Sequence, residues 1–78
     1  MSGRILIADE IPTNRIILRV KLASARYDVL QVGLAMDLIP TAREQRPDVI
    51  LLDDAMGDGA GIKLCRALKA DKIAGSIP

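Results

Sequence analysis

Histidine is absent from this 78-residue sequence, and cysteine occurs once, as Cys65. These absences exclude an internal disulfide, zinc sites of the usual Cys/His spacing, and nucleophiles of the Ser-His-Asp or Cys-His type. There is one Tyr and no Trp or Phe, so the bases of a nucleic acid would find almost no ring to stack on. We therefore expect no nucleic-acid partner and no triad or zinc chemistry.

Long apolar runs and blocks of one charge are also absent. No stretch approaches the roughly 18 apolar residues of a membrane span, and the start, MSGRILIADE, lacks the apolar run of a signal peptide. Eleven basic and ten acidic residues leave a net charge of +1, with neither sign gathered into a patch for anionic lipid. A cytoplasmic protein with no membrane partner is expected.

The overall composition is that of a globular domain, since half of the residues are hydrophobic and 27% are charged. The length allows one domain at most. A chain of this size buries only about 60% of its unfolded surface, so its stability is marginal and the loss of any element would lower it noticeably.

Apolar runs typical of buried strands alternate along the chain with segments of helical spacing. The order βαβαβα, three strands and three helices with short connections, predicts a parallel sheet with right-handed crossovers and an α/β fold. The predicted strands cover residues 4–8, 27–33 and 48–52, and the predicted helices cover residues 14–25, 35–46 and 62–70.

Local signals add detail to the helices and loops. Apolar spacing predicts that Ile17 in the first helix and Cys65 in the last face the core. Pro40 lacks the N–H that an interior helical residue donates, so the second helix is expected to begin near it, with Asp37 as a candidate cap. Three glycines within residues 55–61 predict irregular structure there.

Acidic pairs follow two of the predicted strands. Asp9 and Glu10 end the first strand, and Asp53 and Asp54 end the third. Sites in open parallel sheets form where loops leave the carboxyl ends of the strands. If these two strands are neighbours, Asp9, Glu10 and Asp53 converge, and a hard divalent cation would offset the repulsion between their charges.

Magnesium suits such a cluster because it prefers oxygen ligands, keeps several waters and often shares its coordination sphere with phosphate. One of the carboxylates could then attack a phosphoryl group. Acids at strand ends are also common as helix caps and solvated loop residues, and Asp9 and Glu10 precede a helix whose N-terminus favours negative charge. From spacing alone, both interpretations stay open.

Residues 54–59 imitate the opening of a calcium-binding loop, with Asp at its first and fifth positions and Gly at its sixth. The third position is Met56 and the twelfth is Cys65, where a bidentate Glu is required, which argues against an EF-hand. Neither a G-x-G-x-x-G motif after the first strand nor a G-x-x-x-x-G-K-[ST] loop occurs, so nucleotide binding by those routes is not expected.

Two motifs, ILIADE at residues 5–10 and PDVILLDDAMGDGAG at residues 47–61, resemble the first strand, the third strand and the following loop of response-regulator receiver domains. The resemblance covers the whole chain and the spacing between the motifs fits without gaps. It implies a flavodoxin-like doubly wound parallel sheet. The residues of both motifs, together with RALKAD at residues 66–71, are most similar to those of receivers attached to diguanylate cyclases.

The resemblance also implies a function in a two-component phosphorelay. Asp53 would be the phosphoacceptor, taking phosphate from a sensor histidine kinase or phosphotransfer protein and regulating an attached output domain. Glu10 and Asp53 would bind Mg²⁺ directly, Asp9 would bind it through water, and the backbone carbonyl of Ala55 would complete the protein ligands. A module of this kind is not itself an enzyme, although its parent protein could carry a catalytic output domain.

The sequence ends at Ile77 and Pro78, where the fourth strand of the family would begin. We therefore expect residues 1–78 to be a partial receiver domain that lacks the fourth and fifth strands, with the phosphate-contacting groups they carry in the family. The exposed edge of the third strand would then have unpaired backbone groups available to another chain, which predicts a homodimer through the third strands. The alternative function is a non-phosphorylated receiver-like interaction or dimerisation module.

Overall fold

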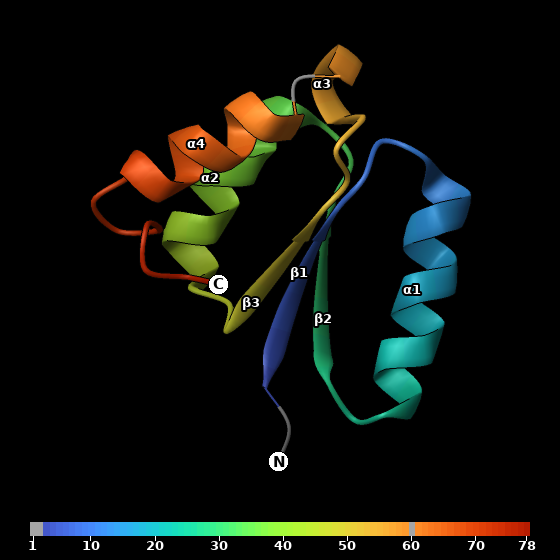
Figure 1. The fold of residues 1–78 in the computed structure, drawn as a ribbon. Helices are drawn as coiled ribbons and strands as arrows, with labels where there is room; N and C mark the ends of the chain where they lie inside the picture. The colour runs from blue at the N-terminus through green and yellow to red at the C-terminus, as the bar shows by residue number, and fades with distance from the viewer. Residues whose placement is uncertain (1–2, 60) are drawn as a thin grey trace.

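The computed structural model describes residues 3–59 and 61–78 and has the predicted α/β architecture (Figure 1). Three strands form one parallel sheet in the order β2-β1-β3. The strands are β1 (Arg4–Ala8), β2 (Asp28–Val32) and β3 (Val49–Leu52), and the helices are α1 (Pro12–Ser24), α2 (Ala35–Gln45), α3 (Met56–Gly59) and α4 (Gly61–Ala70). The predicted order of strands and helices is confirmed, with the one-turn helix α3 as an addition.

Strand β1 is the centre of the sheet, and its sequence explains why. Its last four residues, Ile5 to Ala8, are all buried, because apolar side chains on both faces suit a strand that is covered from above and below. It pairs with β2 on one side, beginning at Arg4 and Asp28, and with β3 on the other, beginning at Ile5 and Val49. The carboxyl ends of β1 and β3 are therefore neighbours.

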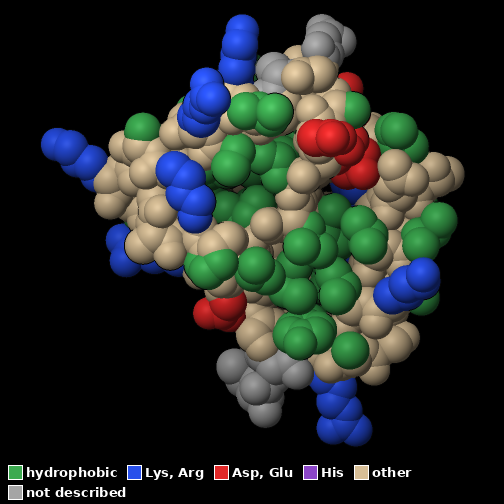
Figure 2. Space-filling model, in the orientation of Figure 1, with side chains coloured by type: hydrophobic (Ala, Val, Ile, Leu, Met, Phe, Trp, Pro, Cys, Tyr) green, Lys and Arg blue, Asp and Glu red, His purple; other side chains and the backbone are tan. Residues whose placement is uncertain are grey.

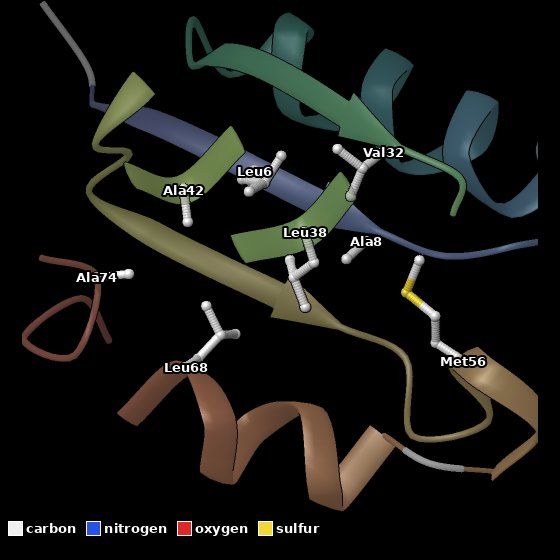
Figure 3. Close-up of a cluster of buried hydrophobic side chains, with 8 residues drawn as sticks. All are labelled: Leu6, Ala8, Val32, Leu38, Ala42, Met56, Leu68 and Ala74. Atoms are coloured by element: carbon white, nitrogen blue, oxygen red, sulfur yellow. The ribbon is translucent and has the colours of Figure 1, made fainter. Parts of the chain in front are cut away.

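The two faces of the sheet are covered unequally, with α1 on one side and both α2 and α4 on the other (Figure 1). The main core lies on the side of α2 and α4 and includes Leu6 and Ala8 of β1 (Figure 3). Side chains alternate along a strand, so Ile5 and Ile7 point to the face of α1. The buried residues of the main core are Leu6, Ala8, Val32, Leu38, Ala42, Met56, Leu68 and Ala74.

Helix α2 begins at Ala35, five residues before Pro40, so the predicted start near Pro40 is wrong. A proline at this position removes one backbone hydrogen bond, which would have reached the carbonyl of Met36. Met36 is exposed, so water can solvate that carbonyl, while Leu38 and Ala42 are completely buried and hold the helix against the sheet. Leu34 occupies the N-cap position, and Asp37 lies in the first turn without capping it.

The buried faces of α1 and α4 also differ from the prediction. Ile17 is 53% exposed and Cys65 is exposed, although both were expected to face the core. The half-buried residues of α1 are Arg15, Leu18 and Leu22, and α4 packs through Gly61, Leu64 and Leu68. Each helix carries apolar residues on more than one face, so spacing alone cannot identify which face meets the sheet.

The glycine-rich stretch after β3 forms the single turn α3, where the sequence predicted irregular structure. Gly57 and Gly59 adopt positive φ values of 67° and 84°, which other residues rarely reach. Met56 is fully buried and anchors the turn to the core. At Gly61, a Cβ atom would lie 2.5 Å from the backbone of Asp54, so the start of α4 requires glycine for this close approach.

The C-terminal residues return to the outer edge of β3. The N–H of Ile50 donates to the carbonyl of Pro78 over 2.9 Å. The turn before them is held by Asp71, whose carboxylate accepts hydrogen bonds from the Arg43 side chain and from the backbone N–H groups of Ile73 and Ala74. One edge of β3 is thus partly occupied by the end of the chain.

Replacing Leu38 by alanine tests the importance of the α2 contact. The side chain is completely buried, so we expect Leu38→Ala to lower the free energy of unfolding by about 2–5 kcal/mol. Ile62→Ala, at a residue that is 65% exposed, is the matched control and should change it by less than about 1 kcal/mol. Urea denaturation followed by circular dichroism measures both, and equal losses would contradict the described core.

The Asp71 contact predicts a dependence of stability on acid. The Arg43 guanidinium and the N–H of Ala74 lower the pKa of the Asp71 carboxyl from 3.8 to about 2. A lowered pKa means that this stabilisation is present above about pH 4 and is lost as the pH falls towards 2. The difference in urea midpoint between wild type and Asp71→Asn should therefore shrink over that range, and a difference that stays constant would contradict this assignment.

Candidate functional site

The acidic site lies where β1 and β3 end side by side. Asp53 leaves β3 with its N–H donating to the carbonyl of Ala8 over 3.0 Å, and Asp9 leaves β1 with its N–H donating to Val32 of β2 over 3.2 Å. Asp9 and Asp53 line the same open groove, of about 260 Å³. The rest of its lining is apolar and comprises Ile7, Ala8, Leu18, Leu51 and Leu52.

Asp9 is the only buried charged residue in the described part of the chain, with 6% of its surface exposed. Its carboxylate accepts a hydrogen bond from the N–H of Ile11 over 2.9 Å, which closes the turn into α1. Its backbone carbonyl accepts a second hydrogen bond, of 2.6 Å, from the guanidinium of Arg15. These contacts hold both the backbone and the side chain of Asp9.

Glu10 is exposed and turns towards the loop after β3. Its carboxylate accepts a hydrogen bond from the N–H of Gly57, 47 residues along the chain. This contact joins the loop after β1 to α3, so the two acidic motifs meet across the carboxyl edge of the sheet. The sequence alone predicted that Glu10 and Asp53 lie near each other. It did not predict that the backbone N–H of Gly57 links their two loops.

Asp53 is half-buried and lines the groove. Its carboxylate accepts a weak hydrogen bond, of 3.3 Å, from the N–H of Ala55, and its carbonyl accepts one from Met56. Asp54, its neighbour, is exposed, and its carbonyl accepts a hydrogen bond from Gly61. Of these two acids, only Asp53 lines the groove, which makes it the better placed of the two to meet an incoming group.

The oxygen donors of the site suit magnesium by type, although they are not assembled around one point. Across residues 3–59 and 61–78, no three Asp, Glu, His or Cys side chains gather closely enough to hold a metal ion. Glu10 is engaged by Gly57, and the carbonyl of Ala55 accepts a hydrogen bond from Gly59 over 3.0 Å. Metal binding would therefore require these side chains to move closer together.

Arg15 is a residue of this site that the sequence analysis did not identify. It is half-buried and reaches back six residues to the Asp9 carbonyl. The available signal was its position three residues before Leu18 and seven before Leu22, because this spacing places all three on one helix face. That face meets the sheet.

With this geometry established, comparison with known families identifies the chain. The family model described as "Response regulator receiver domain" matches residues 5–77. The chain belongs to this family. A receiver domain is a signalling module rather than a catalytic domain, which agrees with the expectation that this chain is not an enzyme.

Two curated relatives illustrate the similarity. Response regulator PleD of Caulobacter vibrioides is 37% identical over 78 residues, which cover 100% of this chain and 17% of PleD. DNA-binding response regulator MtrA of Mycolicibacterium smegmatis is 35% identical over 71 residues, covering 91% of this chain and 31% of MtrA. This receiver sequence thus spans less than a third of the length of either relative.

Solved structures support the fold. The N-terminal domain of a response regulator receiver protein from Methanoculleus marisnigri superposes with a TM-score of 0.92 at 22% identity, covering 97% of this chain and 62% of that one. The receiver domain of a sensor histidine kinase from Pseudomonas aeruginosa, described with magnesium coordinated in its active-site cleft, has a TM-score of 0.85 at 26% identity. The matched region covers 64% of that chain and 100% of this one.

One further property concerns membranes. Within the described residues of this receiver, none of the helices combines the length and the apolar character needed to cross a bilayer.

Proposed function

We propose that Asp53 is the phosphoacceptor of a two-component phosphorelay and receives its phosphoryl group from a sensor histidine kinase or a phosphotransfer protein. The observation that carries this proposal is that Asp53 and Asp9 line one open groove at the carboxyl ends of neighbouring parallel strands. Asp53 is the acid whose carboxylate is least engaged there, with a single weak hydrogen bond to the N–H of Ala55.

The proposed transfer is chemically balanced. A carboxylate oxygen of Asp53 forms a bond to phosphorus while the bond between phosphorus and the donor's imidazole nitrogen breaks, and the nitrogen keeps the electron pair and takes up a proton. The catalytic contribution of such a site is mostly position and charge, because phosphoryl transfer needs little covalent help from the protein. The groove that Asp53 lines is open, which leaves an approach for the donor's imidazole.

Magnesium fits the proposed site by the chemistry of its donors. Asp9, Glu10 and Asp53 would hold it with the carbonyl of Ala55, and when bound it would offset charge on the phosphoryl oxygens. The receiver domain from Pseudomonas aeruginosa, described with magnesium coordinated in its active-site cleft, supports this assignment by analogy. Asp9 would act through water, as the family resemblance implies, and the N–H of Ile11 holds its carboxylate in place.

The output domain and the location of the parent protein also belong to the proposal. The resemblance of both motifs to receivers attached to diguanylate cyclases makes a cyclase the output that we propose. MtrA is named as a DNA-binding response regulator, so an output that binds DNA is the alternative. Exchange of phosphate with a histidine kinase would place the chain in the cytoplasm.

A second candidate function, homodimerisation, is supported by the outer edge of β3. The N–H of Asp53 points to β1, whereas the N–H of Ile50 points away from β1 and donates to Pro78. Because backbone N–H groups alternate along a strand, the N–H of Leu52, two residues after Ile50, also points outwards. Figure 2 shows hydrophobic side chains gathered over the strands between α1 and α4, with acidic side chains at the rim. A second copy pairing its β3 with this edge would cover the groove that includes Leu51, which is 38% exposed.

Phosphoacceptor function predicts a sharp difference between adjacent acids. Incubation with Mg²⁺ and a labelled small-molecule phosphodonor should label wild type and Asp54→Asn alike and should leave Asp53→Asn unlabelled. Labelled Asp53→Asn protein, or an unlabelled wild type, would contradict the proposal.

Dimerisation through β3 predicts that a charge in the groove keeps the chain monomeric. In sedimentation at rising concentration, wild type should shift from 8.4 kDa to twice that mass, whereas Leu51→Lys should remain a monomer because pairing would bury its ammonium group. Ile62→Lys, on the exposed side of α4, should dimerise like wild type. A wild type that stays monomeric at high concentration would rule out this interface.

A further inference from the structure

Arg15 makes two contacts that a solvated helix residue would not make. Its Nη1 donates a 2.6 Å hydrogen bond to the backbone carbonyl of Asp9, and its guanidinium lies against the backbone of Gly33. A Cβ atom built on Gly33 would lie 2.7 Å from Nη1 and 3.0 Å from Cζ, and its three nearest atoms all belong to this guanidinium. Arg15 therefore joins the loop after β1 to the end of β2.

The position of Asp9 depends on a small set of contacts, of which the Arg15 contact is the only charged one among those described. The N–H of Asp9 donates to Val32 and its carboxylate accepts from Ile11. Arg15 holds the remaining polar group, the carbonyl through which the chain continues into Glu10. A planar guanidinium can keep this geometry while lying flat against Gly33, where any larger residue would displace it.

We propose that Arg15 is a positioning residue of the acidic site, clamping the Asp9 carbonyl against the end of β2 and thereby fixing the direction in which Asp9 and Glu10 leave β1. This inference rests on the proposed function of those acids as a magnesium site, but the clamp itself is a property of the metal-free chain. Gly33 is its second half, because it leaves the space that the guanidinium occupies.

Positioning and simple charge predict opposite effects on metal binding. If Arg15 acted only as a nearby cation, its removal would reduce repulsion and tighten Mg²⁺ binding. If it positions the ligands, its removal weakens binding, and contacts of this supporting kind typically change metal affinity by about tenfold or more. We expect Arg15→Gln to weaken Mg²⁺ binding about tenfold, with Arg15→Lys between it and wild type because lysine can donate to the carbonyl but cannot lie flat on Gly33.

Amide hydrogen exchange tests the clamp without any metal. In Arg15→Gln the N–H of Ile11, which bonds to the Asp9 carboxylate, should exchange about fivefold faster or more, while amides of the central strand around Ile7 remain unchanged. Arg19→Gln, on the exposed surface of the same helix, is the matched control and should exchange like wild type. Unchanged exchange at Ile11 in Arg15→Gln overturns the inference.

Gly33→Ala supplies the second variant. Its new methyl group should displace the guanidinium, so exchange at Ile11 should rise as in Arg15→Gln, and the double variant should be no worse than either single one. Fully additive effects, or tighter Mg²⁺ binding by Arg15→Gln in titration calorimetry, would overturn the positioning role. If the exchange results hold and wild type binds no Mg²⁺, the clamp stands and the proposed metal site fails.

Discussion

The pairing of β1 with a parallel neighbour on each side is the constraint on which the rest of this structure depends. Ile5 to Ala8 of β1 are all buried, which requires cover on both faces of the sheet. The ladder between β1 and β3 then sets the register of Ala8 against Leu52. Because the next residue of each strand is an aspartate, this register places Asp9 and Asp53 beside the same groove.

The loops beyond the strands turn this adjacency into a site through backbone hydrogen bonds. Asp9 is held by Ile11 and Arg15 on the side of α1, and Glu10 is held by Gly57 on the side of α3. The carboxylate of Asp53 is left with one weak hydrogen bond, and Asp53 lines the groove. A phosphoacceptor needs this combination of fixed neighbours and an accessible carboxylate, because the neighbours keep their positions while the nucleophile meets its donor.

The two faces of the sheet are covered unequally by the helices. The face towards α2 and α4 has a contiguous core, whereas α1 contains no fully buried residue and leaves Ile16, Ile17 and Val20 about half exposed. Apolar surface beside a strand edge that is only partly paired favours association. The chain spans 62–64% of the length of the receiver structures it resembles, so in those structures further residues are available to cover the corresponding surface.

Local sequence signals predicted each strand to within two residues, since short apolar runs ending at acids have few alternatives. They failed where a residue's preference opposed tertiary burial. Pro40 lies inside α2 because the burial of Leu38 and Ala42 outweighs one missing hydrogen bond. The glycines after β3 form a helical turn because Met56 is drawn into the core. Ile17 and Cys65 are exposed because each helix has apolar residues on more than one face and buries a different one.

The sequence by itself determined the α/β order, the parallel sheet and the presence of acids at two strand ends, because these follow from periodicity and chain order. It also carried the receiver motifs that the family match confirmed. Only the tertiary structure decided which helix faces are buried, that Glu10 bonds to Gly57, and that Arg15 lies between Asp9 and Gly33. These contacts join residues from different elements, and their geometry exists only once the sheet has brought those elements together.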